Sequence, residues 1–333
     1  MEGISLMKAA WYDRQGPAAE VLQLGELPAP EPETGEVRVR LSLSGISPGD
    51  TKKRAGWPGS PMIYPRVIPH SDGVGVIDKV GSGVDTGRIG QRVWIYGAQS
   101  YRPFGTAAEL TCVPYAQAVV LPAEVSYELG ACLGIPGITA HRAVFSDGPV
   151  SGKTVLVQGV LGAVGLIAAQ LAHWGGATVI GTVTRARDLD HIDASVVSHA
   201  IALDQTDPPS AIRAHAPGGV DRVIEVAFSD NADLDTAVVA NDAVIAAYAS
   251  RAERPELPFW PLLFANVTLR LLGSDDFSAR AKQQASTDLT AAAQQGALTV
   301  DVAPIYPLAE VAAAHDHVDN GPRNGRILVA IPT

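Results

Sequence analysis

Three glycines at a spacing of three residues, Gly159, Gly162 and Gly165, could hold a phosphate group against the backbone. Gly159 permits a tight turn, Gly162 lets the chain approach a pyrophosphate without a Cβ atom in the way, and Gly165 allows a helix to pack closely on a strand. The N–H groups at the start of that helix, including those of Ala163 and Val164, have no partner within the helix. They would donate to the anion, which the helix dipole also favours.

The segments around the glycines have the patterns that such a site needs. Residues 154–157 are a short, mostly β-branched apolar run, which predicts a buried strand, and residues 166–172 favour a helix. Gly175 and Gly176 would end this helix, and residues 178–183 predict a second strand. Strand, glycine turn, helix and strand form the unit that binds dinucleotides, and the full set is more specific than the glycines alone. The alternative is a tight turn in a parallel sheet that binds nothing.

The end of the second strand indicates which dinucleotide is bound. An NAD site usually has an acidic residue there, about 20 residues after the glycines, which accepts a hydrogen bond from the ribose 2′-hydroxyl. Residues 181–184, which end at Thr184, contain no acidic residue, and Arg185 and Arg187 follow. A guanidinium pairs with the 2′-phosphate that a carboxylate would repel. The sequence therefore predicts NADPH, with solvated turn residues as the alternative interpretation of the two arginines.

The composition is typical of an α/β protein with two domains. The chain has 333 residues, of which 47% are hydrophobic and 33 are glycine, and this length allows two separate cores. A net charge of −10 argues against nucleic acid or an anionic membrane surface as a partner. No apolar run is long enough to span a bilayer, and no secretory signal is evident. With only two cysteines, Cys112 and Cys132, we expect a cytoplasmic protein without disulfides.

The first part of the chain is predicted to be rich in short strands. Residues 36–43 alternate strictly between apolar and polar, which predicts a half-buried strand. Other short strands are predicted, with glycines between several of them, at residues 8–12, 74–80, 92–96 and 107–113. Many short strands with glycine turns indicate a compact β-barrel domain.

From residue 126 onward, strands alternate with helices. Beyond the glycine-turn unit, further strands are predicted at residues 200–203, 221–226, 242–248 and 268–272. This alternation indicates a doubly wound parallel sheet. Ala249 and Ser250 follow the end of one of these strands, which is the usual place for ligand contacts in such sheets. The tail is predicted to hold two helices and a last strand at residues 326–330.

Several motifs accompany the glycine turn: GISPGDT at residues 45–51, IPHSDGVGV at 68–76, GIPGITA at 134–140 and GRILV at 325–329. Together with the order of the parts, they resemble the medium-chain dehydrogenase/reductase superfamily, and within it the zinc-free quinone oxidoreductases of the ζ-crystallin-like group. The resemblance covers nearly the whole chain and is specific as a set. It implies a homodimer, with a GroES-like β-barrel catalytic domain over residues 1–125, a Rossmann domain over 126–270, and a C-terminal return to the catalytic domain over 271–333.

The zinc-dependent alcohol dehydrogenases of the same superfamily match less well. Their catalytic zinc needs thiolate and imidazole ligands, but Ser47, Ser71 and Ile135 occupy the corresponding positions. Their second zinc needs four closely spaced cysteines, which two cysteines cannot provide. The sequence therefore predicts no bound metal.

The histidines near these positions do not restore a metal site. His70 lies one residue away from the ligand position, and we interpret it as a cleft or packing histidine. His315 and His317 are two residues apart in a predicted helix, where such side chains diverge. We expect them on the surface.

The resemblance also implies particular site residues. Ser47 stands where members of the group commonly have an asparagine that contacts the region of the nicotinamide. Thr139 would contact the nicotinamide side of the cofactor, and Asn324 and Arg326 match the closing contacts of the family.

An acceptor that is reduced without a metal must already be electrophilic or be polarised by hydrogen bonds. Quinones and α,β-unsaturated ketones meet this condition, whereas simple alcohols do not. Two loops rich in glycine, proline and aromatic residues could form a flat apolar slot for a planar acceptor, lined by Trp57, Tyr64, Tyr101 and Phe104. Each of these aromatic residues could equally be an ordinary loop anchor.

We therefore predict hydride transfer from NADPH to a quinone or enone, with the protein contributing orientation and exclusion of water. The proton would come from water or from a hydroxyl, with Tyr64 as the first candidate donor and Ser47 as the second. Two other classes stay open. One is a non-catalytic NADPH-binding protein of the crystallin kind, and the other is an alcohol dehydrogenase that binds zinc through unusual ligands.

Overall fold

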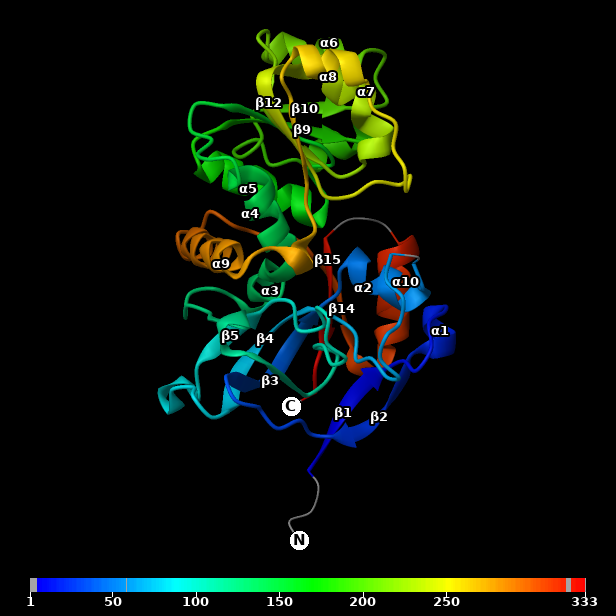
Figure 1. The fold of residues 1–333 in the computed structure, drawn as a ribbon, viewed down its shortest axis with the longest axis vertical. Coiled ribbons are helices and arrows are strands. Elements are labelled where there is room, and N and C mark those ends of the chain that lie inside the picture. The colour runs from blue at the N-terminus through cyan, green and yellow to red at the C-terminus, as the bar shows by residue number, and fades with distance from the viewer. Residues whose placement is uncertain (1–4, 58, 322–324, 333) are drawn as a thin grey trace. The chain divides into compact units, whose positions relative to one another are not determined.

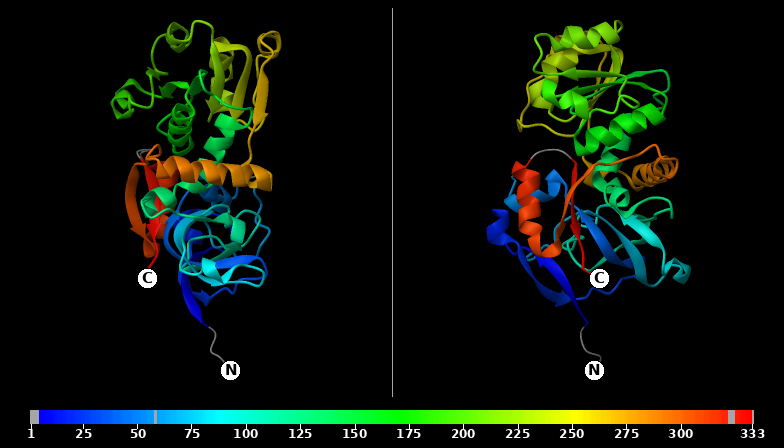
Figure 2. Two further views of the ribbon diagram at one scale, coloured as in Figure 1. Left: turned by 90° about the vertical axis from the view of Figure 1, so that its left-hand side faces the viewer. Right: turned by 180° about the vertical axis from the view of Figure 1, so that it is seen from behind.

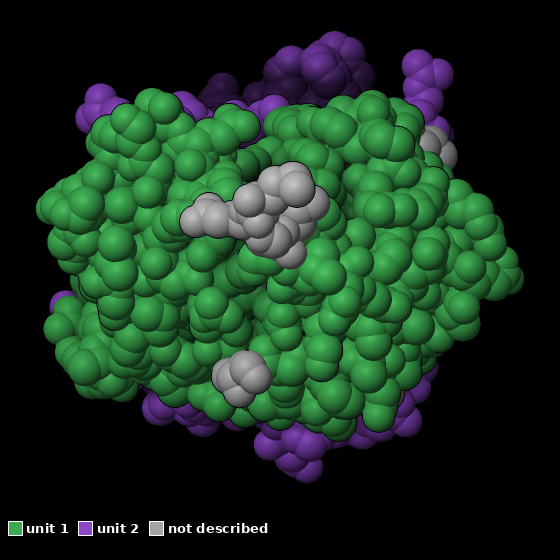
Figure 3. Space-filling model, turned by 90° about the horizontal axis from the view of Figure 1, so that it is seen from below, with its two compact units in different colours: residues 1–136, 286–294, 299–333 green, residues 137–285, 295–298 purple. Residues whose placement is uncertain are grey.

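The computed structural model describes residues 5–57, 59–321 and 325–332, and Figures 1 and 2 show it as a ribbon. The chain divides into two compact units, which Figure 3 distinguishes by colour. Unit 1 comprises residues 1–136, 286–294 and 299–333, and unit 2 comprises residues 137–285 and 295–298.

Unit 1 is built on a mostly antiparallel sheet. Its strands lie in the order β14–β15–β3–β4–β5–β7, and β6 also pairs with β3. Over the described residues the strands do not close into a complete ring, so the barrel is open. These strands are β3 (Glu36–Gly45), β4 (Asp72–Val80), β5 (Arg92–Ile95), β6 (Leu110–Pro114), β7 (Ala118–Val120), β14 (Val302–Pro307) and β15 (Arg326–Ala330).

Strand β3 carries the alternation that its sequence predicts. Val37, Val39 and Leu41 point into the core of unit 1, whereas Arg38 and Arg40 lie on the other side and pair with Asp78. A separate antiparallel pair, β1 (Leu6–Trp11) and β2 (Gln23–Pro28), contributes to the same core. The helices of unit 1 are α1 (Ala18–Val21), α2 (Pro48–Ala55), α3 (Tyr127–Gly130) and α10 (Val311–Asn320).

Unit 2 contains a six-stranded sheet in which every pair of neighbours is parallel, so the predicted doubly wound sheet is confirmed. The order is β10–β9–β8–β11–β12–β13. The order in which strands are added to the sheet therefore reverses between β8 and β11, which we call the reversal point. Ligands of such sheets bind outside the carboxyl ends of the strands at this point. The strands are β8 (Thr154–Val157), β9 (Thr178–Val183), β10 (His199–Ala202), β11 (Val220–Glu225), β12 (Val239–Ala247) and β13 (Thr268–Leu271).

Helices connect these strands (Figure 1). They are α4 (Ile138–Phe145), α5 (Ala163–Trp174), α6 (Pro208–His215), α7 (Phe228–Val238) and α8 (Phe259–Phe264). The residues of α9 (Ala279–Gln294) are divided between the two units. The short helical turns are η1 (Thr86–Arg88), η2 (Tyr115–Gln117), η3 (Leu133–Gly137), η4 (Ala186–His191), η5 (Ser274–Asp276) and η6 (Leu308–Glu310). No helix of the described residues has the length and hydropathy needed to cross a membrane.

A partly buried ionic cluster connects three parts of unit 2. Asp147, which follows α4, accepts a hydrogen bond from Arg222 of β11 at 2.8 Å and from Arg270 of β13 at 2.9 Å. Burial by itself raises the pKa of Asp147, but the two arginines outweigh it and lower the pKa to about 2. Asp147 is therefore ionised at neutral pH and compensates the charge of Arg222, which is fully buried.

Two buried histidines lie in a chain of hydrogen bonds in unit 1. Ser44 Oγ lies 2.8 Å from His70 Nδ1 and 2.7 Å from Thr106 Oγ1, and the Thr106 hydroxyl donates to the Asp72 carbonyl. His70 Nε2 lies 2.8 Å from Nε2 of His315. Since Thr106 uses its hydrogen on the carbonyl, Ser44 donates to Thr106 and accepts from His70. Burial lowers the pKa of both histidines, so both rings are neutral, and His315 then donates to His70.

The prediction that His315 lies on the surface is wrong, because its exposed fraction is 0%. Helix α10 packs against α1, α2 and β15, and it turns Ala314 and His315 toward them. His317, two residues further on, is half-buried, which agrees with the expected divergence. The interpretation of His70 as a packing histidine agrees with its full burial against His315.

Candidate dinucleotide and substrate sites

The glycine turn has the geometry that only glycine allows. Gly159 directly follows Gln158 at the end of β8 and has a φ of 66°, in the left-handed region. A Cβ atom on Gly165 would lie 2.3 Å from the carbonyl oxygen of Gly159, so a side chain there would push α5 away from the turn. Gly162 donates its N–H to the carbonyl of Gly159 at 2.9 Å and is exposed. The backbone is thus open to a ligand at Gly162.

Helix α5 begins at Ala163, directly after this exposed glycine. The N–H groups of Ala163, Val164 and Gly165 have no carbonyl partner within the helix, because they belong to its first turn. An exposed helix N-terminus after a strand is a binding site for a phosphate group. The turn therefore fits the pyrophosphate of a dinucleotide.

The residues predicted to select NADPH lie on one exposed turn. Thr184, Arg185 and Arg187 follow β9 and are all exposed. Arg187 is 3.8 Å from Asp188, too far for a tight ion pair. The carboxylate of Asp204 accepts a hydrogen bond from the N–H of Ala186 at 3.0 Å, which holds the turn against the end of β10. Both guanidinium groups are accessible to a 2′-phosphate.

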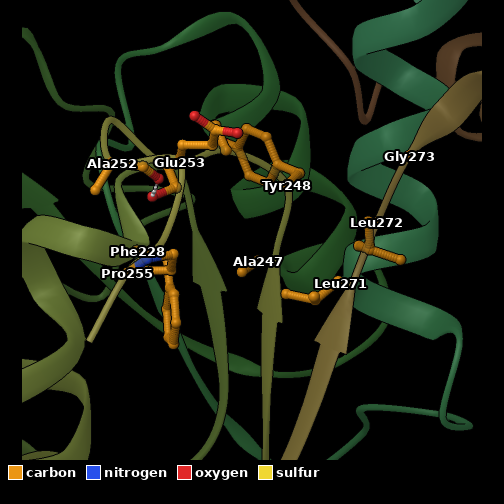
Figure 4. A pocket seen from close by; sticks show the side chains of 11 residues that line it. Phe228, Ala247, Tyr248, Ala252, Glu253, Pro255, Leu271, Leu272 and Gly273 are labelled. Carbon is orange, nitrogen blue, oxygen red and sulfur yellow. Dashed lines mark hydrogen bonds between the residues drawn. The ribbon is translucent and has the colours of Figure 1, made fainter. Parts of the chain in front are cut away.

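A pocket of about 390 Å³ lies at the carboxyl ends of β12 and β13 (Figure 4). Ala249 and Ser250 line it, and the carbonyl of Ala249 accepts a hydrogen bond from the N–H of Phe228 at 3.1 Å. Burial raises the pKa of Tyr248, with a smaller contribution from Glu225, so this phenol keeps its proton. The remaining lining is mostly apolar, from Phe228, Ala247, Pro255, Leu271 and Leu272.

Ser47 caps α2 in unit 1. Its N–H donates to the carboxylate of Asp50 at 2.7 Å, so Asp50 stabilises the start of the helix. The Ser47 hydroxyl is buried and faces the N–H of Asp50 in this capping box, and its own hydrogen has no acceptor within the part of the chain that the structure describes. It is therefore available to an added ligand in unit 1.

The other residues implied by the resemblance are placed as follows. Thr139 is buried in α4 of unit 2. Arg326 begins β15 in unit 1 with an exposed fraction of 6%, and its Nη2 atom lies 4.0 Å from the carboxylate of Asp72. Asn324 lies outside the described residues.

The two aromatic loops meet through Tyr64. Its hydroxyl donates to the carbonyl of Tyr101 at 2.6 Å. A bridge between Ile68 and Phe104 connects the second loop to the segment that follows the first loop. Trp57, Tyr101 and Phe104 are exposed. The structure thus brings the loops of Tyr64 and Tyr101 together, with the one proton of Tyr64 given to the backbone.

Comparisons with known proteins agree with this arrangement. The family model described as alcohol dehydrogenase GroES-like domain matches residues 33–123, and the one described as zinc-binding dehydrogenase matches residues 163–287. Mouse quinone oxidoreductase is 28% identical to this chain, over 99% of each chain. The solved structure of a mycobacterial quinone oxidoreductase has 26% identity and a TM-score of 0.85, and the match covers 97% of this chain and 99% of that one. The chain belongs to the medium-chain dehydrogenase/reductase superfamily.

A structure of a mycobacterial protein complexed with NADPH is also similar to this medium-chain dehydrogenase/reductase. It has 25% identity and a TM-score of 0.82, and the match covers 98% of this chain and all of that chain. The predicted pairing of a GroES-like domain with a Rossmann domain is confirmed by these matches. The chain is an oxidoreductase that binds a nicotinamide cofactor.

The residues at the zinc positions of the superfamily do not fit zinc. Ser47 and Ser71 offer hydroxyl groups, and Ile135 offers an aliphatic side chain, whereas zinc takes thiolate, imidazole or carboxylate ligands. The N–H of Ile135 instead donates to the carboxylate of Asp72 at 2.7 Å. Within residues 5–57, 59–321 and 325–332, no three His, Cys, Asp or Glu side chains are grouped as a metal would require.

Sequence reasoning missed a polar cluster directly behind the glycine turn. Gln158, Thr182, Glu225 and Asp235 are all fully buried in unit 2. One signal was present in the sequence: Gln158 directly follows an apolar strand, and Glu225 ends another. These two strands, β8 and β11, are neighbours at the reversal point of the sheet. Polar residues at such strand ends face the ligand side of the fold.

Proposed function

We propose that this protein is an NADPH-dependent reductase that transfers hydride to a quinone or an α,β-unsaturated carbonyl compound without zinc. The observation that carries this proposal is an intact dinucleotide turn in a chain whose zinc positions hold Ser47, Ser71 and Ile135. Reduction without a Lewis acid requires an acceptor that is already electrophilic or is polarised by hydrogen bonds.

Different residues would bind the pyrophosphate and the 2′-phosphate of the cofactor. The turn from Gly159 to Gly165 would bind the pyrophosphate through N–H groups. Arg185 and Arg187 would bind the 2′-phosphate. NADPH supplies the hydride when it is bound. The remaining contacts that we assign to the cofactor are Thr184, Thr139, Ala249, Ser250, Asn324 and Arg326.

The acceptor would be held by residues of unit 1. Trp57, Tyr101 and Phe104 offer exposed aromatic surface for a planar acceptor. Tyr64 and Ser47 are the two candidates for donating a hydrogen bond to the developing oxyanion. The buried Ser47 hydroxyl is available for this role, whereas Tyr64 would first have to release the carbonyl of Tyr101.

The cofactor assignment is tested by titrating the protein with NADPH and with NADH. Each charge-assisted hydrogen bond contributes roughly 1.5–3 kcal/mol, so NADPH is expected to bind about tenfold more tightly or better. Arg185→Ala and Arg187→Ala are expected to weaken NADPH much more than NADH, while Arg280→Ala, an exposed arginine on α9, changes neither. Equal affinities for the two nucleotides in the unaltered protein would refute the assignment.

The reaction is tested with a panel of benzoquinones, enones, enoyl thioesters and ethanol, read by the loss or gain of NADPH absorbance. We expect reduction of a quinone or enone, no oxidation of ethanol, and no effect of prolonged chelation. Tight NADPH binding without turnover on any acceptor would identify a non-catalytic NADPH-binding protein instead. One zinc per chain in metal analysis, with activity lost on chelation, would identify a zinc enzyme with unusual ligands.

We also propose that two copies associate through an apolar edge of unit 2, formed by β13 and α8. β13 is the last strand of its sheet, so one side of its backbone can pair with the same strand of a second copy about a twofold axis. Trp260, Phe264 and Leu271 on this edge are 65%, 72% and 72% exposed. Light scattering is expected to show a dimer, and Trp260→Lys with Phe264→Lys is expected to give a folded monomer. A monomeric unaltered protein would exclude this interface.

A further inference from the structure

A chain of buried hydrogen bonds leads from the glycine turn to a carboxyl group. The N–H of Gly159 donates to Thr182 Oγ1 at 3.1 Å, and the Thr182 hydroxyl donates to Gln158 Oε1 at 2.6 Å. Nε2 of Gln158 then donates to Oδ1 of Asp235 at 2.8 Å. In each of these three hydrogen bonds the donor lies on the side of the glycine turn and the acceptor on the side of Asp235. Asp235 is therefore the acceptor on which the order of the whole chain depends.

This chain of hydrogen bonds crosses the reversal point of the parallel sheet. Gln158 directly follows β8, Thr182 lies in β9, and Asp235 lies in α7, the helix that follows β11. All three side chains are fully buried, so water cannot replace a lost partner. A buried polar group that loses its hydrogen bond costs about 1–3 kcal/mol. The hydrogen bonds of this chain therefore fix the orientation of the Gln158 amide.

Glu225, at the end of β11, faces Asp235 and takes the negative charge of the pair. Its carboxylate accepts hydrogen bonds from the N–H of Ala227 and from the Asn231 amide at 3.1 Å, near the start of α7. Asp235 accepts from a single donor, Gln158, and its side chain is in hydrogen-bond contact with Glu225, to which a protonated Asp235 donates. An ionised oxygen in that position would be unstable. Burial raises the pKa of Asp235 well above its usual value, and the charge of Glu225 raises it further.

We propose that Asp235, in its neutral form, is a positioning residue for the cofactor, because it holds Gln158 and Thr182 in the orientation that fixes the turn at Gly159. The proposal rests on the proposed function only in that the turn binds the cofactor. Without this acceptor the Gln158 amide can rotate, and the Thr182 hydroxyl loses its fixed acceptor. The turn must then be ordered when the cofactor binds, and the cost of ordering lowers the affinity.

Ionisation of Asp235 is expected to change the affinity for NADPH. The groups that face Asp235 are Glu225 from β11 and the amide of Gln158 next to β8, while Asn231 from its own helix donates to Glu225. Tyr248 directly follows β12. Burial raises the pKa of Tyr248, with a smaller contribution from the charge of Glu225, so its phenol stays neutral. On the other side α6 packs against α7, and its Arg213 donates to the carbonyls of Ala237 and Val239.

A carboxyl group with a raised pKa is neutral below that pKa and loses its proton as the pH rises through it. The second negative charge beside Glu225 would then disturb the pair and weaken binding of the anionic cofactor. We therefore expect NADPH affinity to fall on the alkaline side. This alkaline loss is expected to be absent in Asp235→Asn, which has no proton to lose there.

The test compares two substitutions of the same residue. Asp235→Asn keeps an oxygen that accepts from Gln158, and is expected to bind NADPH with an affinity within about twofold of the unaltered protein. Asp235→Ala and Thr182→Val each remove one link and are expected to raise the Kd about tenfold, the equivalent of one buried hydrogen bond. The double variant is expected to be no weaker than either single one, because both break the same chain. Asp233→Ala, exposed on the same helix, is the matched control.

Hydrogen exchange of the turn amides without cofactor provides a readout that does not depend on NADPH. Asp235→Ala is expected to speed exchange of the amides of residues 159–162, and Asp235→Asn is expected not to. A lower melting temperature of Asp235→Ala with unchanged exchange and Kd would show a purely structural role and refute the proposal. Equal losses in Asp235→Asn and Asp235→Ala would also refute it. Faster exchange in a protein that does not bind NADPH would support the positioning role and refute the proposed function alone.

Discussion

Acidification is expected to destabilise unit 1 through its buried histidine pair. The hydrogen bond of 2.8 Å between His70 and His315 requires one ring to donate and the other to accept, and protonation would turn both into donors. Burial lowers the pKa of His315 from 6.5 to about 3, with a smaller contribution from the charge of Arg54, and burial also lowers the pKa of His70. In the unfolded chain both histidines take up protons near the ordinary pKa of about 6.5.

The size of the effect follows from these pKa values. The stability that comes from keeping a histidine neutral is fully present above the unfolded pKa, and it is lost as the pH falls toward the folded pKa. At about pH 5, roughly 1.5 units below the unfolded pKa, the neutral His315 lowers the free energy of unfolding by about 2 kcal/mol. This loss is a large share of the roughly 5–15 kcal/mol that stabilises a typical protein, and the lowered pKa of His70 acts in the same direction.

The assay is urea unfolding followed by circular dichroism at several pH values between about 8 and 5, where few carboxyl groups titrate. His315→Gln has an amide that can donate to His70 and does not titrate. Between pH 7 and pH 5 we expect this variant to lose about 2 kcal/mol less stability than the unaltered protein. His191→Gln, which changes an exposed histidine, is expected to leave the pH dependence unchanged. Parallel curves for the unaltered protein and His315→Gln would refute the reasoning.

Three further substitutions and one control test the fold and the site. Asp147→Asn leaves the buried Arg222 uncompensated and is expected to reduce the free energy of unfolding by roughly 3–5 kcal/mol, measured by urea unfolding; a change below about 1 kcal/mol would contradict it. Gly165→Val is expected to abolish NADPH binding while keeping the circular dichroism spectrum, whereas Gly218→Ala, at a position with open space around it, is expected to bind normally. Tyr64→Phe is expected to lower kcat about 10²-fold for enones and less for quinones if Tyr64 donates the proton, and unchanged rates on both would make it a loop anchor.

Local patterns in the sequence were sufficient for the unit that binds the dinucleotide. The strands predicted at residues 154–157 and 178–183 are β8 and β9 with the same bounds, and the last strand at residues 326–330 is β15. These segments are short, apolar and buried, so their neighbours in the sequence indicate their structure. By contrast, β14 was not predicted, because its residues are mostly exposed or half-buried and show no regular alternation.

The sequence by itself determined the glycine turn, the exposed arginines after β9 and the lack of zinc ligands, because each depends on residues that are close together or on residue type alone. The tertiary structure alone decided which distant polar groups meet inside each unit. His70 and His315 are 245 residues apart in the chain, and Gln158 and Asp235 are 77 apart. A polar residue on a helix or at a strand end carries no local sign of the partner that packing will bring to it. Burial then fixes the protonation of that residue, because only the folded chain removes the water that would otherwise solvate its charge.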